Sequence, residues 1–225
     1  MEEKNIKALR KELQDVSEAP TWRATRWISI YVTRVLLSTS VTPNMVTGFH
    51  FMFLLAASIC LAQGRQPWLW VGVSFIFTSY VVDCVDGELA RGKELCTFTG
   101  GALEEIVHFV GGSIVLLGAT YGASKQGFLT AWPIGIAAIC GGLIFEFGYA
   151  RILEKANPEV SYGWLYNLTK GLILFMPLNT NILAIGGLTG YLFPSLTIWA
   201  CVSNLAWIIA SILYYKAERK NYKVL

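Results

Sequence analysis

Apolar residues occur in this chain as long runs separated by short polar stretches. A helix that crosses a bilayer needs about 20 predominantly apolar residues, so runs of this length predict membrane spans. Six segments fit, the fifth being the least apolar: residues 43–62, 68–91, 97–121, 129–153, 161–188 and 194–214. Thr42 and Pro43 suit the start of the first span, because threonine caps a helix and proline has no N–H to leave unpaired. We expect Gly92 to end the second span as a glycine cap.

The region before the first span has a different pattern. Apolar residues recur at helical spacing within a charged segment at Ile6, Leu9, Leu13 and Val16. Residues 20–39 combine tryptophan and tyrosine with arginine, a mixture that suits the headgroup layer of a membrane. We therefore expect residues 20–39 to form an amphipathic helix that lies in the membrane plane, and the charged helix before it to lie on the bilayer or to pack on a partner helix. The alternative for residues 20–39 is a connector that is amphipathic without binding lipid.

Composition and charge favour an integral membrane protein. Hydrophobic residues make up 54% of the 225 residues, and charged residues only 15%. With six spans and both termini in the cytoplasm, every Lys and Arg except Arg65 and Lys125 falls on or just inside the cytoplasmic side, in agreement with the positive-inside rule. The predicted fold is an all-α integral membrane protein, with six transmembrane helices preceded by an amphipathic interfacial helix and both termini cytoplasmic.

Ionisable residues cluster where the second span meets the third. Asp83 and Asp86 are three residues apart and share one helix face, whereas Gly100, Glu104 and His108 are four apart and share a face of the next helix. Ionisable groups between apolar runs are costly, and they are usually functional. If the two helices pack side by side, the three carboxylates and the histidine converge on one point.

Such a cluster has the chemistry of a metal site that handles phosphate. Carboxylate oxygens are the ligands that Mg²⁺ and Mn²⁺ prefer, and these ions commonly hold a substrate phosphate as well. Gly87, Ala90 and Gly100 have little or no side chain, so a bulky ligand could approach the backbone closely. Arg91 could bind a phosphate with its planar guanidinium group. The cluster therefore indicates a pyrophosphate site.

The same residues resemble the signature of the CDP-alcohol phosphotransferase family, which reads D, two residues, DG, two residues, AR, about eight residues, G, three residues, D, three residues, D. The matching positions are Asp83, Asp86, Gly87, Ala90, Arg91 and Gly100. Glu104 and His108 stand where the family has its last two aspartates. The resemblance implies Mg²⁺ or Mn²⁺ on Asp83, Asp86 and Glu104, and it places His108 at the position of the general base. Histidine can accept a proton but removes a negative charge, so a ligand role for His108 and the number of metals stay open.

The register of the second half of the motif has an alternative. Counting from Gly101 gives Glu105 and Phe109, and phenylalanine can neither bind a metal nor accept a proton. We therefore prefer Glu104 and His108, with Glu105 as an alternative ligand.

Four further residues complete the set of candidates. The run TPNMVT resembles the start of the first membrane helix in the family, where Asn44 would face the nucleotide or cap the helix. We expect His50 to be a packed helical residue rather than a ligand. Arg151 and Lys170 are candidate contacts for an acceptor phosphate, the alternative being that both reach out to the membrane interface.

The resemblance implies a transferase that moves a substituted phosphate or phosphonate from a CDP- or CMP-linked donor to an alcohol and releases CMP, in phospholipid or head-group biosynthesis. The alcohol would be a lipid or a small polar molecule. Two alternatives are a hydrolase of the nucleotide donor and a non-catalytic scaffold or transporter that retains the fold. The resemblance also implies a homodimer, and we expect no nucleic-acid partner.

We expect three parts of the chain: interfacial helices over residues 1–40, a transmembrane catalytic domain over 41–216, and a basic cytoplasmic tail over 217–225. The active site would face the cytoplasm. A bacterial inner membrane is the default location, with an endomembrane as the alternative.

Overall fold

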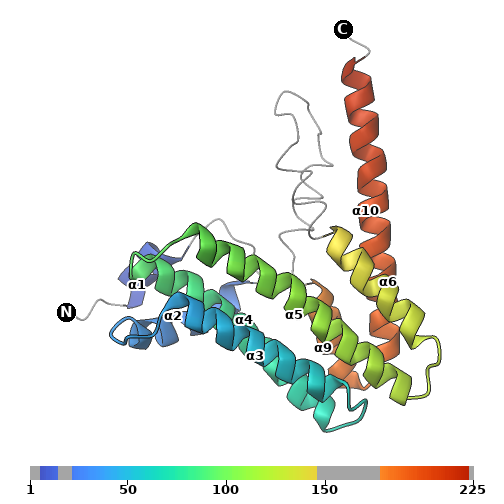
Figure 1. Cartoon of the computed structure of the whole chain (residues 1–225), viewed down its shortest axis with the longest axis horizontal. Coiled ribbons are helices and arrows are strands. Elements are labelled where there is room, and N and C mark those ends of the chain that lie inside the picture. Colours follow the sequence, from blue (N-terminus) through green and yellow to red (C-terminus); the bar gives the residue numbers. More distant parts are fainter. Residues whose placement is uncertain (1–5, 15–21, 146–177, 223–225) are drawn as a thin grey trace.

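The computed structural model describes residues 6–14, 22–145 and 178–222, and within these residues it contains helices and no strand (Figure 1). The helices are α1 (Ile6–Leu13), α2 (Trp22–Leu36), α3 (Pro43–Leu61), α4 (Trp68–Gly92), α5 (Phe98–Lys125), α6 (Ala131–Leu143), α9 (Leu178–Thr189) and α10 (Leu192–Tyr222). The helical prediction is confirmed for this part of the chain.

Four helices are long and apolar enough to cross a membrane: α3, α4, α5 and residues Leu192–Lys216 of α10. α6 is a shorter apolar helix. The chain is therefore a multi-pass membrane protein. Six spans and cytoplasmic termini stay predictions, because most of the fifth predicted span lies outside the described residues, as does the end of the fourth.

The helix boundaries agree with the apolar pattern at the start of the chain and differ at two later points. Thr42 caps α3, and its side chain accepts a hydrogen bond from the Met45 N–H. α5 continues to Lys125, beyond the predicted end at residue 121. α10 continues to Tyr222, so much of the predicted basic tail extends the last helix.

α4 ends at Gly92, but a different residue from the predicted one turns the chain. Gly92 is the last residue of the helix, but the left-handed residue that turns the chain is Glu94, with φ 56°. The Leu95 N–H then reaches back to the Ala90 carbonyl at 2.9 Å, which completes the turn. Gly92 instead allows close packing, because a Cβ there would lie 2.6 Å from the Leu37 Cδ2 atom.

α3 is the central helix of the amino-terminal half, and it packs against both α4 and α5 (Figure 1). Glycines on α5 allow the approach of α3 to that helix. A Cβ on Gly111 would collide with Leu54, and a Cβ on Gly118 would collide with the Ser58 carbonyl. α3 therefore brings its own side chains to the point where we expected only α4 and α5 to meet.

The second group of helices consists of α6, α9 and α10, with α6 lying beside α10 (Figure 1). Small residues again allow close contact, since a Cβ on Gly141 would lie 2.6 Å from the Ser203 hydroxyl. α1 and α2 pack at the motif end of α4, where Leu9, Leu13 and Ile30 form a small buried cluster.

Candidate active site

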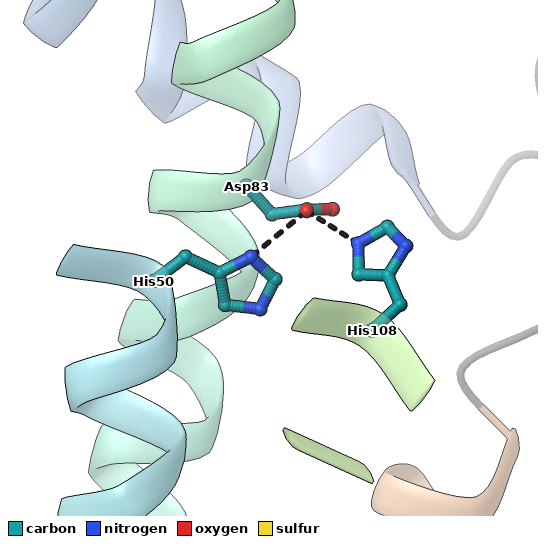
Figure 2. A group of neighbouring side chains, drawn as sticks. All are labelled: His50, Asp83 and His108. Carbon is teal, nitrogen blue, oxygen red and sulfur yellow. Dashed lines mark hydrogen bonds and ion pairs between the residues drawn. The ribbon is translucent and has the colours of Figure 1, made fainter. Parts of the chain in front are cut away.

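Asp83 on α4 is the centre of the polar cluster (Figure 2). His108 on α5 places its Nε2 atom 2.6 Å from Oδ1 of Asp83. His50 on α3 places its Nδ1 atom 3.0 Å from the same oxygen, at an angle that departs from a hydrogen bond. Asp83 and His50 are buried, whereas the His108 side chain is 39% exposed. The two imidazole rings thus converge on one carboxylate oxygen from helices on either side.

Asp86 lies one turn further along α4 and is 3% exposed. The Thr47 hydroxyl donates to its Oδ2 atom at 2.8 Å. The Gly87 N–H lies 2.7 Å from its Oδ1 atom. These contacts hold the buried carboxylate in one orientation, which satisfies a group that would otherwise be costly to bury.

Two overlapping groups of side chains have the composition and spacing of a metal site. Asp83, Asp86 and Glu104 offer oxygen atoms that all lie within 4.8 Å of one another. Three carboxylates fit a hard divalent ion such as Mg²⁺ or Mn²⁺. His50, Asp83 and His108 form the second group at the same spacing, with two nitrogen donors and one oxygen. Asp83 belongs to both groups.

An open cavity of about 170 Å³ lies beside the carboxylates. Its lining includes every residue predicted for the nucleotide and its phosphates, namely Asn44, Gly87, Ala90, Arg91 and Gly100. Asp86 and Glu104 also line it. The structure therefore places two of the three carboxylates, Asp86 and Glu104, and the small residues of the motif around one space.

Glu104 and Glu105 differ in their surroundings. Glu104 is partly buried and belongs to the carboxylate group, whereas Glu105 is exposed and lies outside both candidate metal groups. Arg151 and Lys170, the candidate acceptor contacts, lie outside the described residues.

From the sequence, Thr47 was not considered and His50 was placed outside the site. His50 is packed, as expected, but its ring packs against the motif aspartate. A signal was present, because Asn44, Thr47 and His50 are spaced by three residues and share a face of one helix. Asn44 was already a candidate, so following its face along α3 would have found both.

Comparison with known proteins gives the family of the chain. Residues 40–212 match the CDP-alcohol phosphatidyltransferase family. The chain therefore belongs to this family, as its motif predicted. It is a transferase of substituted phosphate groups, of the CDP-alcohol phosphotransferase class.

Three curated proteins illustrate its relatives. The chain is 25% identical over 190 residues to the phosphatidylinositol phosphate synthase of Cutibacterium acnes, covering 82% of this chain and 89% of that protein. It is 22% identical over 187 residues to the archaetidylinositol phosphate synthase of Pyrococcus horikoshii, covering 83% and 89%. It is 28% identical over 155 residues to the bifunctional IPC transferase and DIPP synthase of Rubrobacter xylanophilus, covering 69% of this chain and 33% of that protein. The chain therefore spans only a third of the Rubrobacter protein.

Proposed function

We propose that the protein transfers a substituted phosphate from a CDP-linked donor to an alcohol and releases CMP, with a divalent ion at Asp83, Asp86 and Glu104. One observation carries the proposal: Asp86 and Glu104 line the cavity together with Arg91 and the small motif residues, and Asp83 offers an oxygen within 4.8 Å of theirs. A hydrolase or a scaffold would not need an acceptor, and the test below separates these alternatives.

The cavity residues would bind the donor. Gly87, Ala90 and Gly100 leave room for the nucleotide beside the backbone, and Arg91 supplies a planar cation for a phosphate. Asn44 adds a polar group to the lining of the cavity. Mg²⁺ or Mn²⁺, when bound, would neutralise the pyrophosphate and stabilise the CMP leaving group.

His108 would accept the proton of the acceptor hydroxyl. Its Nε2 atom faces Asp83, so a proton on Nε2 would be donated to that carboxylate and Nδ1 would be the basic atom. As the hydroxyl oxygen bonds to phosphorus, the bond from phosphorus to the CMP oxygen breaks, and the hydroxyl proton passes to Nδ1. The partial exposure of His108 supports access of the acceptor to this ring.

The relatives suggest which acceptor to test first. Two of them are named as synthases of an inositol phosphate lipid. We therefore place the protein in phospholipid biosynthesis, with CDP-diacylglycerol and a phosphorylated inositol as the first donor and acceptor. CMP-linked phosphonates should be tested as further donors, and other alcohols as further acceptors. Arg151 and Lys170 are our candidates for the acceptor phosphate, and Glu105 for an alternative ligand.

The proposed arrangement in the membrane follows the sequence pattern. Six helices would cross the bilayer, with both termini and the active site cytoplasmic and α1 and α2 at the interface. Residues 1–40, 41–216 and 217–225 would form the interfacial part, the catalytic domain and the tail. A homodimer in a bacterial inner membrane is the proposed assembly.

The test is CMP release by the purified protein in nanodiscs, with each donor, with and without each acceptor, and with Mg²⁺, Mn²⁺ or EDTA. We expect release that requires both metal and acceptor. Release without any acceptor would favour the hydrolase. If no donor reacts and none binds in the presence of metal, the scaffold takes the place of the transferase.

A further inference from the structure

Glu88 is a fully buried carboxylate that the proposed chemistry does not use. It lies on α4 between Asp86 and Arg91, with 0% of its surface exposed. Two hydroxyls of α2 donate to it: Ser29 to Oε1 and Thr33 to Oε2, both at 2.6 Å. The Gln14 amide, directly after α1, donates to Oε1 at 2.8 Å. A buried carboxylate is costly unless it is hydrogen-bonded, so these contacts hold both amino-terminal helices to the motif helix.

The end of α1 also contacts the cavity arginine. The Leu13 carbonyl accepts a hydrogen bond from Nε of Arg91 at 2.7 Å. The next residue, Gln14, contacts Glu88 and also donates to the Arg26 carbonyl of α2 at 2.8 Å. Two successive residues of the amino-terminal segment therefore bind α4, one at Arg91 and the other at Glu88.

Packing supports the same position of α1. Leu13 is 3% exposed and lies in a cluster with Leu9 and Ile30. Gly92 faces this cluster, since a Cβ there would lie 3.4 Å from a Leu13 methyl group. The absence of a side chain at residue 92 lets the end of α1 reach the arginine.

The contact has a consequence for the guanidinium group. Arg91 is exposed, and a long exposed side chain loses rotamer freedom when it binds a ligand. With Nε held by the Leu13 carbonyl, the terminal nitrogens lie beside Gly87 in the cavity wall, 3.4 and 3.5 Å from the point where a Cβ on Gly87 would sit. These two nitrogens can then bind two oxygens of one phosphate.

We propose that Glu88 and Gln14 are positioning residues that fix the end of α1 and, through the Leu13 carbonyl, hold Arg91 ready for the donor phosphate. The proposal rests on the proposed function, because it assumes that Arg91 binds the donor. It makes α1 part of the donor site, although α1 precedes the family match at residues 40–212.

The test is a double-mutant cycle on the full chain, with the dissociation constant of CDP measured by calorimetry in the presence of Mn²⁺. We expect Arg91→Ala to weaken CDP binding about tenfold or more, the size of one charged hydrogen-bonded contact. Gln14→Ala should weaken it by about threefold to tenfold. The double variant should bind CDP no more weakly than Arg91→Ala alone, because Gln14 acts through the arginine.

Two further variants provide a control and a second test of the same contact. Lys11→Ala changes an exposed residue of the same helix and should leave CDP binding unchanged. Glu88→Gln keeps the shape of the side chain and removes its charge. Like Gln14→Ala, it should weaken CDP binding by itself and have no further effect when it is combined with Arg91→Ala.

The outcomes separate the inference from the function. If the wild-type protein does not bind CDP, the proposed function and this inference both fail. If Arg91→Ala weakens binding but Gln14→Ala and Glu88→Gln do not, the function stands and the inference is overturned. Losses that add in the double variants would show a general structural effect and would also overturn it.

Discussion

The buried polar side chains around the motif differ from a buried hydroxyl of α10 in where they find their partners. Around the motif, Thr47 donates to Asp86, and His108 contacts Asp83, so buried groups meet across helices. In α10, Ser203 is equally buried, but its hydroxyl donates to the Trp199 carbonyl of its own helix at 2.8 Å. Both halves are helical, yet among the residues that the structure describes the carboxylates gather only around the motif.

The difference has a physical reason. A hydroxyl bonded to its own helix is satisfied wherever that helix packs, so it does not determine which helix packs beside it. A buried carboxylate needs donors or a cation from other elements and is expensive without them. The motif half therefore keeps its charges for a ligand, whereas the α6 and α10 half is held mainly by close packing of small and apolar residues.

The largest expected effect comes from removing one charge in the motif half. Asp86→Asn keeps the size of the side chain but removes the charge of a proposed metal ligand. We expect CMP release to fall by about 10³-fold, the effect of losing electrostatic stabilisation of the leaving group. Ser203→Ala is the matched change in α10 and should leave the rate within about twofold, because the Ser203 hydroxyl bonds to its own helix and is not part of the proposed site. Equal losses in both variants would remove the contrast between the halves.

His108→Ala should have the next largest effect. Loss of a general base lowers kcat by about 10²-fold or more. Because we assign His108 a proton and not a metal, Mn²⁺ affinity measured by electron paramagnetic resonance should stay close to wild type. A large drop in Mn²⁺ affinity would instead make His108 a ligand and leave the base unassigned.

His50 tests whether α3 contributes to the site through Asp83. His50→Leu removes the nitrogen that lies 3.0 Å from the Asp83 carboxylate, and we expect Mn²⁺ to bind about tenfold more weakly, as for other residues that orient a ligand. His50→Asn retains a polar nitrogen at a similar position and should recover much of the affinity. If both variants bind Mn²⁺ as the wild type does, His50 is a packing residue only.

The smallest effect on catalysis should come from a change in the α6 and α10 half. Gly135 on α6 faces Thr120 on α5, and an added Cβ would collide with the threonine hydroxyl. Gly135→Ala should therefore lower stability by about 1–3 kcal/mol, seen as a lower thermal midpoint, with kcat and KM unchanged. Gly48→Ala is the control, because nothing lies within 4 Å of a Cβ there. A kinetic defect in Gly135→Ala with normal stability would show that the halves are coupled.

The sequence predicted the parts of the protein that depend on local pattern. Apolar runs predicted the positions of α3, α4 and α5, because a span must satisfy its own backbone as a helix. Helical periodicity placed Asp83 and Asp86 on one face and Glu104 and His108 on another, since residues three or four apart are neighbours on a helix. Those faces, with Arg91 and the small residues, also predicted the family.

Only the tertiary structure decided which other side chains join them. His50 and Thr47 reach the aspartates because α3 packs against both α4 and α5, and the glycines that allow this packing do not indicate their partners. Glu88 resembles any other charged residue at a helix end until Ser29, Thr33 and Gln14 enclose it. Contacts between residues 39 to 74 positions apart depend on how whole helices pack, and helical periodicity carries no information on that packing.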